Sequence, residues 1–331
     1  MRISSSFGLL VKANLIRKFH SIEQLKFLWK LSKKKKYPFL VLGKINKTIF
    51  IENFSGIVAL NCIQKLRIRE SKNNNLIYVG SGNSWKDLVE TLLKMRIYGL
   101  ENMSFIPGSV GAASVQNMGA YGLEFKDVCK YVDTIDLSDG KRRRFYNQEC
   151  KFKYRGSIFK KIKYKNFIVI SVCLKIRKSW QPVLNHKKII DKFPSRVTVK
   201  DITKFIFQER CKSIPNPSIL GNSGSFFKNP TVHPEISDWI RKKFPKYQSK
   251  IFFTENKIHA GWLIKQCNLQ GYRIGGAEVY RKNPLILINR GYSTGQDIIK
   301  LSQYVHQKVF EKFGISLEKE AIFIGKNGEI T

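Results

Sequence analysis

The chain is poor in acidic residues, in closely spaced cysteines and in long apolar runs. Of its 331 residues, 24 are Asp or Glu and 60 are Lys or Arg, which gives a formal charge of +36. The longest apolar run, residues 167–174, is far shorter than the about 20 residues that a helix needs to cross a bilayer. The run predicts a buried strand, and no membrane partner is expected. Apolar residues make up 43% of the chain, which excludes intrinsic disorder.

Cysteine usage indicates a reducing compartment. The closest pair, Cys129 and Cys150, are 21 positions apart, which excludes a Cys-x-x-Cys metal or redox motif. Several cysteines stand in apolar runs, as buried thiols of a cytoplasmic protein do. We expect a cytoplasmic protein without a metal site. No acidic residue precedes Glu23, as in a transit peptide, but the basic residues there are no denser than elsewhere, so no targeting segment is expected.

The positive charge by itself favours nucleic acid or another anionic partner. The basic residues are spread, however: 44 of the 60 are Lys, and only Lys33–Lys36, Arg142–Arg144 and residues 151–165 are dense. Lys is a solvated point charge, whereas Arg is the usual reader of bases and phosphates. We therefore expect no nucleic-acid partner. Compositional drift in an AT-rich genome and a preference for an anionic substrate both remain as explanations of the charge.

Hydrophobic periodicity predicts mixed strands and helices. Ser84 caps one helix, and Thr294 with Asp297 opens another, which Gly314 ends. The pattern changes near residue 200, which predicts two α+β units joined near 178–200. Further helices are predicted at 200–211, 233–244 and 260–267. Strands are predicted at 39–43, 48–51, 56–60, 76–80, 131–137, 166–176, 285–288 and 317–324.

Residues 106–122, the glycine-rich segment, form the most informative motif. Its four glycines and small residues let backbone N–H groups approach a ligand and bind phosphate oxygens. A tight turn packed against a helix is the alternative. The usual nucleotide loops are absent, because Trp85 stands where the third glycine of a Gly-x-Gly-x-x-Gly motif belongs.

Two polar residues stand out in the C-terminal half. On a strand over 317–324, Glu320 shares a face with Ile322 and Ile324, which predicts a carboxylate that is buried or lies at a pocket rim. Either position tends to raise its pKa, as a general acid requires, while an exposed edge-strand glutamate is the alternative. Ser225 has no Gly-x-Ser-x-Gly elbow around it, which disfavours a Ser-His-Asp hydrolase.

Five segments, read together, carry a family likeness. Their order and spacing match over nearly the whole chain, from Ser6 to Gly325. They are residues 106–122, 154–160, 221–230, 261–289 and 317–325. With these segments the chain resembles the UDP-N-acetylenolpyruvoylglucosamine reductase family.

The resemblance implies an α+β fold, in which a two-lobed FAD-binding unit of the vanillyl-alcohol-oxidase (PCMH) type precedes a C-terminal α+β substrate domain. The first lobe would be residues 1–62, joined by the last strand at 317–331. The second lobe would be 63–199, and the substrate domain 200–316. We expect a monomer whose partners are NADPH and a small-molecule UDP-sugar.

The resemblance also implies the reaction, the NADPH-dependent and FAD-mediated reduction of the enolpyruvyl ether of UDP-N-acetylglucosamine to UDP-N-acetylmuramate. The product is a peptidoglycan precursor. Hydride passes from NADPH to FAD and from flavin N5 to the methylene carbon of the substrate. Arg155 and Glu320 would stabilise the resulting enolate, since electrostatic stabilisation of an oxyanion is usually the largest catalytic contribution. Ser225 would donate the proton.

Family positions also assign the binding residues. The cofactor-binding set is Gly43, Ile106, Pro107, Gly108, Ser109, Gly111, Ala112, Gln116, Asn117, Gly119 and Ala120. The substrate-binding set is Tyr121, His186, Asn229 and Asn283.

The chain departs from the family pattern in the loop after Gly43. Ile45 stands where the family has a glycine, and a β-branched residue resists positive φ. Lys44 and Lys47 would compensate by offering charge to the FAD phosphates. We expect weak FAD retention or slow turnover.

Three other positions differ as well: His186 replaces a tyrosine, Ser213 replaces a lysine, and Ile322 replaces an arginine near the flavin. The catalytic set is intact. Two alternatives stay open, namely a drifted homologue that binds the UDP-sugar with little turnover and a basic nucleic-acid-binding protein.

Overall fold

The computed structural model describes residues 1–193, 196–245, 251–254 and 256–330. The chain forms two compact units, and each is assembled from separate stretches of sequence. Unit 1 comprises Met1–Ala13, Ile45–Phe54 and Cys211–Thr331, whereas unit 2 comprises Asn14–Lys44 and Ser55–Arg210.

The last unit boundary, between residues 210 and 211, lies later than the predicted joint near 178–200. It lies within helix α6 (Val199–Ser213). Most of α6 belongs to unit 2, which ends at Arg210. Within that unit the ring of Phe207 packs on that of Phe105, with centroids 5.2 Å apart. The division into two FAD-binding lobes and a substrate domain stays a prediction.

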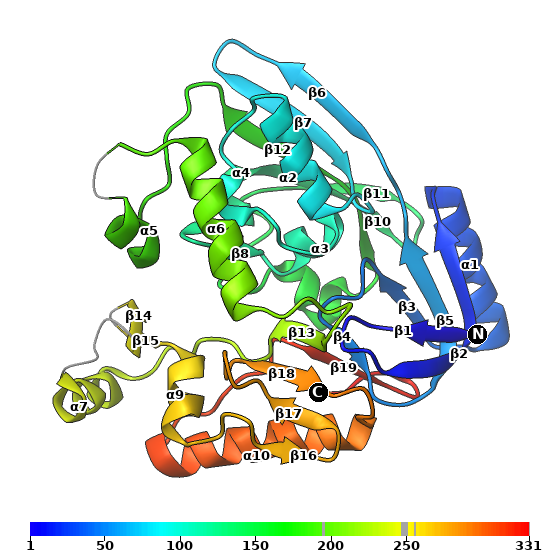
Figure 1. The fold of residues 1–331 in the computed structure, drawn as a ribbon. Helices are drawn as coiled ribbons and strands as arrows, with labels where there is room; N and C mark the ends of the chain where they lie inside the picture. Colours follow the sequence, from blue (N-terminus) through cyan, green and yellow to red (C-terminus); the bar gives the residue numbers. More distant parts are fainter. Residues whose placement is uncertain (194–195, 246–250, 255, 331) are drawn as a thin grey trace. The chain divides into compact units, whose positions relative to one another are not determined.

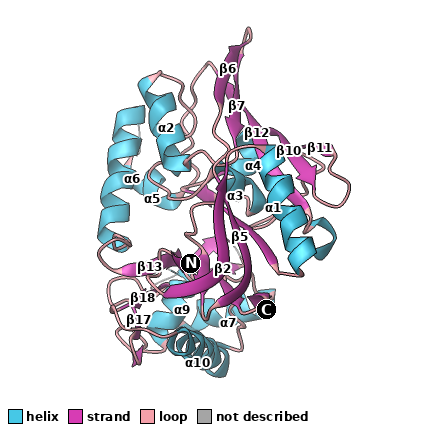
Figure 2. Cartoon of the chain, turned by 90° about the vertical axis from the view of Figure 1, so that its right-hand side faces the viewer, coloured by secondary structure: helices cyan, strands magenta, loops and turns pink. Residues whose placement is uncertain are grey.

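A five-stranded antiparallel sheet forms the centre of unit 2 (Figure 2). Helix α2 (Trp85–Lys94) packs on it through Trp85 and Leu88, and Ser84 caps this helix as predicted, accepting the N–H of Asp87. The predicted strands at 76–80, 131–137 and 166–176 are confirmed. In spatial order the strands are β11 (Arg142–Tyr146), β10 (Cys129–Asp136), β12 (Phe167–Arg177), β7 (Asn74–Gly80) and β6 (Leu66–Glu70).

The sequence reading missed helix α1 (Ile22–Lys35) in unit 2. Its Leu25 and Leu28 are buried in a core with Phe19 and Ala59. The dense run Lys33–Lys36 forms the C-terminal end of this helix, with Lys36 as its C-cap, and cations there complement the helix dipole. In the neighbouring sheet, strand β5 (Phe54–Asn61) lies between β2 (Leu10–Phe19) and β3 (Phe39–Leu42), and it is parallel to β3.

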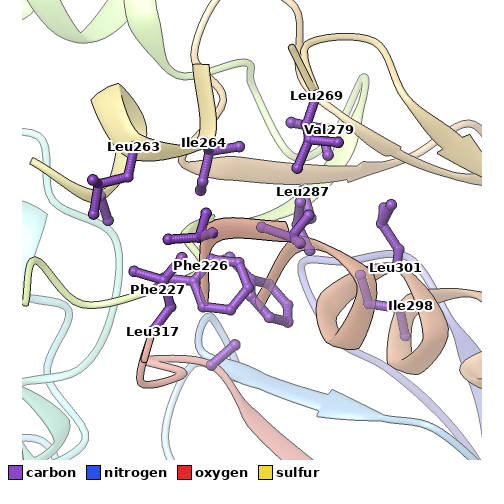
Figure 3. Close-up of a cluster of buried hydrophobic side chains, with 14 of the residues drawn as sticks. Phe226, Phe227, Leu263, Ile264, Leu269, Val279, Leu287, Ile298, Leu301 and Leu317 are labelled. Carbon is purple, nitrogen blue, oxygen red and sulfur yellow. The ribbon is translucent and has the colours of Figure 1, made fainter. Parts of the chain in front are cut away.

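The core of unit 1 gathers around helix α10 (Gly295–Phe313). Its predicted start is confirmed, since Thr294 and Asp297 form a capping box, and Gly314 ends it at a φ of +66°. Figure 1 shows α10 alongside a small sheet, and Figure 3 shows its Ile298 and Leu301 pointing toward Leu287 of that sheet. In spatial order the sheet consists of β13 (Gly221–Ser225), β18 (Ile286–Asn289), β17 (Ala277–Val279) and β16 (Arg273–Ile274).

A second sheet of unit 1 joins distant parts of the chain. Strand β4 (Thr48–Phe50) pairs in parallel with β19 (Ile322–Gly325), which continues into β20 (Gly328–Ile330). The prediction of a strand over 317–324 is thus wrong for its first five residues. Backbone bonds from this segment run instead to the chain around Phe226 and Phe227, outside a regular ladder.

The remaining elements are short, apart from α7. In unit 1 they are β1 (Arg2–Ser4), α7 (Pro234–Lys243), β14 (Phe252–Thr254), β15 (Lys257–Ile258) and α9 (Ala260–Gln266). In unit 2 they are η1 (Glu101–Met103), α3 (Val110–Val115), β8 (Gly119–Ala120), β9 (Leu123–Glu124), α4 (Phe125–Val128), η2 (Ile158–Lys160), η3 (Ile162–Tyr164) and α5 (Lys187–Lys192). Among the described residues, no helix has the length and apolarity that crossing a membrane requires.

Candidate functional site

In unit 1, Ser225 ends strand β13 beside a β-bulge. The register of β13 against β18 shifts between Asn222 and Ser225, and Gly224 lies between them at a φ of +68°. The buried Asn222 holds this turn, because its side-chain oxygen accepts the N–H of Gly224 at 2.9 Å. Bulges re-aim side chains at functional sites. The two buried rings that follow, Phe226 and Phe227, anchor the strand in the core (Figure 3).

Glu320 lies directly beside this strand end. Its N–H donates to the carbonyl of Phe226 at 2.8 Å, and only 6% of the residue is exposed. The expected burial is therefore confirmed, and the exposed alternative is wrong. Strand alternation does not explain the burial, because Glu320 precedes β19 and its backbone bonds to Phe226 instead of to a neighbouring strand.

The same cluster contains Lys47, which the sequence reading assigned to the FAD phosphates. Its ammonium lies 3.3 Å from Oε1 of Glu320 and donates to the backbone carbonyl of Ser225. The structure thus directs Lys47 toward the candidate catalytic residues. We call Lys47, Ser225 and Glu320 the serine cluster. Nothing in the local sequence around Lys47 signals this contact.

Asn229 and Asn283, two predicted substrate contacts, have structural partners in unit 1. The side-chain oxygen of Asn229 accepts the N–H of Ala260 at 3.0 Å and so caps α9, whose own N-cap residue offers no side-chain bond. Asn283 accepts the N–H of Leu285 at 3.2 Å and donates to the carbonyl of Ser213 at 3.3 Å. Substrate contact by either residue stays a prediction.

In unit 2, the glycine-rich segment packs tightly against its neighbours. Ser109 begins α3, where its Oγ accepts the N–H of Ala112 at 3.3 Å. A Cβ on Gly43 would overlap the Ser109 hydroxyl, and one on Gly111 would lie 2.9 Å from the Cβ of Ser81. Only glycine leaves room at these two positions, which brings the predicted cofactor-binding residues Gly43 and Ser109 together.

Asn117 connects this segment to the turn that carries Arg155. It is fully buried, and its amide donates to Glu124 at 2.9 Å and to the carbonyl of Lys153 at 3.0 Å. Lys153 and Gly156 exchange backbone bonds around the turn, in which Arg155 takes a φ of +53°. The side-chain amide of Asn117 is therefore bonded within the protein. Asn117 would contribute to ligand binding by positioning neighbouring residues.

The other predicted cofactor-binding residues lie along the same segment. Pro107 and Ala112 are exposed, while Ile106, Gly108, Gln116, Gly119 and Ala120 are half-buried. Gly119 and Ala120 form β8, which pairs with β9.

Tyr121 and His186 form an aromatic pair in unit 2, with ring centroids 5.2 Å apart. Burial raises the pKa of the Tyr121 hydroxyl further above neutral pH. Burial, with a smaller contribution from Lys188, lowers the pKa of His186. The neutral imidazole Nδ1 accepts the N–H of Lys188 at 3.3 Å and so caps α5. The ring centroid of Phe205 in α6 lies 6.3 Å from that of Tyr121.

The residues around the glycine-rich segment fit a bound dinucleotide cofactor. The hydroxyl of Ser104 and the side-chain oxygen of Asn102 are buried without a hydrogen-bond partner in the described part of the chain. A Cβ on Gly108, where φ is +134°, would meet no atom within 4 Å, so the space before this backbone is open. One residue fits less well, since Ile45 has a φ of +49°.

Comparisons with known proteins match two separate parts of the chain. A family model for an FAD binding domain matches residues 13–146, and one for the C-terminal domain of UDP-N-acetylenolpyruvoylglucosamine reductase matches residues 216–324. The first range contains the glycine-rich segment, and the second contains Ser225 and Glu320.

Relatives of similar length cover nearly the whole chain. A UDP-N-acetylenolpyruvoylglucosamine reductase of Photorhabdus laumondii is 44% identical over 98% of this chain and 96% of its own. One of Buchnera aphidicola is 42% identical over 98% and 95%. The crystal structure of the enzyme from Thermus caldophilus superposes with a TM-score of 0.66 at 21% identity, over 98% of each chain. The predicted α+β fold is confirmed, and the chain belongs to the UDP-N-acetylenolpyruvoylglucosamine reductase family.

Proposed function

We propose that this chain reduces the enolpyruvyl ether of UDP-N-acetylglucosamine to UDP-N-acetylmuramate, with FAD as cofactor and NADPH as hydride donor. One observation carries the proposal: the chain retains Ser225 and Glu320 in one half-buried to buried cluster, at the positions that the family motif assigns to catalysis. The product class places the enzyme in the synthesis of peptidoglycan precursors and hence of the cell wall.

The residues that would hold FAD are those of the glycine-rich segment and Gly43. Their small side chains leave the backbone open, and Ser104 with Asn102 offer polar atoms that lack partners within the described chain. When bound, FAD supplies the hydride chemistry, and the protein supplies orientation and charge.

The work left to the chain is to move a proton and to stabilise charge. Hydride addition to the methylene carbon leaves negative charge on the adjacent carbon and on the substrate carboxylate. Ser225 holds a proton at Oγ, and a carbanion is a base strong enough to take it from a hydroxyl that neighbours orient. Glu320 lies beside Ser225, and Arg155 is assigned to the substrate carboxylate by the family motif alone.

The pair of Tyr121 and His186 would contribute to the substrate site. The Tyr121 hydroxyl is protonated at neutral pH, as in any tyrosine, and can donate a hydrogen bond to a phosphate or sugar oxygen. His186 is a neutral ring that packs edge-on against it. Asn229 and Asn283 would act here mainly by shaping the backbone, given their internal partners.

We further propose a cytoplasmic monomer whose partners are small molecules, with neither nucleic acid nor membrane. All six cysteines have free thiols, which is typical of a reducing compartment. A second function, binding of the UDP-sugar with little turnover, is favoured by one observation. In the loop after Gly43, Ile45 has a left-handed backbone that suits glycine, and this strain would weaken the hold on FAD.

The test is the visible spectrum of the purified full-length protein, followed by anaerobic NADPH and then by the UDP-sugar enolpyruvyl ether. Bound flavin that bleaches with NADPH and recovers with the sugar nucleotide supports the reductase. Flavin that bleaches and never recovers supports binding without turnover. Colourless protein that FAD does not reconstitute contradicts the reductase, and calorimetric titration with the sugar nucleotide then decides whether binding without turnover remains.

The Ser225→Ala variant separates the two half-reactions. Bleaching by NADPH should be unchanged, while recovery with the sugar nucleotide should slow about 10²- to 10⁴-fold, the usual contribution of a positioned acid. Equal recovery rates in the two proteins would assign the proton to another group.

A further inference from the structure

Lys47 and Glu320 meet because two strands run in parallel. Thr48 of β4 is the register partner of Ile322 of β19, and the Lys47 carbonyl accepts the N–H of Ile322 at 2.8 Å. Parallel strands begin at the same end of a sheet, so the residues that precede β4 and β19 are neighbours. The pairing of β4 with β19 in unit 1 therefore places the backbones of Lys47 and Glu320 close together.

The ammonium of Lys47 contacts both a carboxylate and a backbone carbonyl. It lies 3.3 Å from Glu320 Oε1 and donates to the Ser225 carbonyl. The Glu320 side chain is only 6% exposed, and that of Lys47 is 23% exposed. An ion pair at this depth is screened much less by salt than a surface pair. Lys47 therefore places a positive charge beside the carboxylate and links it to the strand that ends at Ser225.

This charge matters for the proposed reaction, on which the inference rests. Negative charge must develop on the substrate beside the serine cluster, so an ionised Glu320 is compatible with its expected role at the enolate only when a cation compensates its charge. We propose that Lys47 is a positioning residue for catalysis: it neutralises Glu320 and fixes it beside Ser225, so that negative charge can develop on the substrate next to it.

The test is a double-mutant cycle in the FAD-loaded, full-length enzyme, after wild-type turnover has been measured. Lys47→Met should lower kcat about 10- to 100-fold, with KM changed less than about threefold. Lys47→Arg keeps the charge and should stay within about threefold of the wild-type kcat. Because Glu320→Gln removes the carboxylate, adding Lys47→Met to it should lower kcat less than about twofold further. Lys326→Met, which removes an exposed charge, is the matched control and should leave kcat unchanged.

Unfolding by urea of the FAD-free proteins gives a second readout. Lys47→Met should lower the midpoint when Glu320 is present, and much less in the Glu320→Gln background, because the variant removes a cation that lies 3.3 Å from a buried carboxylate. Should Lys47→Met fail to fold, Lys47→Gln removes the charge and keeps an amide donor, with the same expectations.

Two results would overturn the inference. One is an equal loss of kcat from Lys47→Met in both backgrounds. The other is a weaker affinity for FAD with an unchanged kcat at saturating FAD, which would return Lys47 to the cofactor phosphates. If the wild-type protein itself shows no turnover, the proposed function fails, and the unfolding cycle still decides whether the two charges are coupled.

Discussion

Ile45 combines a β-branched side chain with left-handed backbone, at a φ of +49°. For a residue other than glycine this conformation costs about 1–2 kcal/mol. The neighbouring Asn46 leaves a buried side-chain oxygen without a partner among the described residues. Strain of this kind is stored in the folded state, and any part of it that FAD binding increases is subtracted from the affinity for FAD.

Replacing Ile45 by glycine should relieve this strain. We expect Ile45→Gly to raise the free energy of unfolding by about 1 kcal/mol and to tighten FAD binding several-fold. Urea unfolding and a flavin fluorescence titration measure the two effects. Ile45→Ala is the control, because alanine keeps a Cβ and hence the strain. If the alanine and glycine variants were equally stable, the backbone would not be the source of the weakness.

His186 predicts a pH-dependent stability. Its pKa is lowered in the folded state, mainly by burial, so protonation favours the unfolded chain. The contribution of the neutral ring is fully present above the unfolded pKa of about 6.5 and is lost as the pH falls through the folded value.

The variant His186→Asn keeps an N-cap acceptor for α5 and does not titrate there. Between about pH 7.5 and about pH 5 the wild type should lose more stability than this variant, as urea midpoints would measure. Parallel losses in the two proteins would show that His186 does not couple to folding.

Among the elements, strand β13 contains a bulge that depends on the φ angle of one glycine. Gly224 has a φ of +68°, and a Cβ there would meet nothing closer than the Lys47 ammonium at 3.9 Å. Gly224→Ala therefore tests backbone strain without a clash. We expect it to destabilise the protein by about 1 kcal/mol and to lower kcat at least tenfold, because the bulge aims Ser225.

Gly314→Ala is the matched control for this element. Its φ is +66°, no atom lies within 4 Å of the added Cβ, and the residue stands at the end of α10. It should destabilise by about the same 1 kcal/mol and leave kcat unchanged. Equal kcat values for the two variants would mean that the bulge has no part in aiming Ser225.

For the whole molecule, the charge of +36 should act on the encounter with its anionic substrate. The electrostatic potential of a strongly charged protein speeds its association with ligands of opposite charge, and salt screens this attraction. For FAD-saturated enzyme, kcat/KM for the UDP-sugar should fall several-fold between about 0.02 and about 0.5 M salt, with kcat unchanged. A kcat/KM that does not respond to salt would favour compositional drift. Salt-sensitive DNA binding above that of an unrelated protein of equal charge would revive the nucleic-acid alternative.

The features of this protein that depend on local chemistry can be predicted from its sequence alone. The caps at Ser84 and at Thr294 with Asp297, and the stop at Gly314, are visible as residue types at fixed spacing, because capping is a matter of neighbouring backbone groups. The family motifs likewise identified the membership of the chain. Helix α1 was not predicted because its apolar face is narrow. This face is buried only through contacts with residues such as Ala59, which are distant in the sequence.

The tertiary structure alone decided which polar side chains remain available for chemistry. Asn117 and Asn229 look like ligands in the motif, yet both are bonded within the protein. Lys47 looks like a phosphate contact in its loop, yet its ammonium binds a carbonyl 178 positions away. The physical reason is that a side chain's partners depend on which backbone segments the sheets bring together, and the parallel pairing of β4 with β19 has no local signature in the sequence.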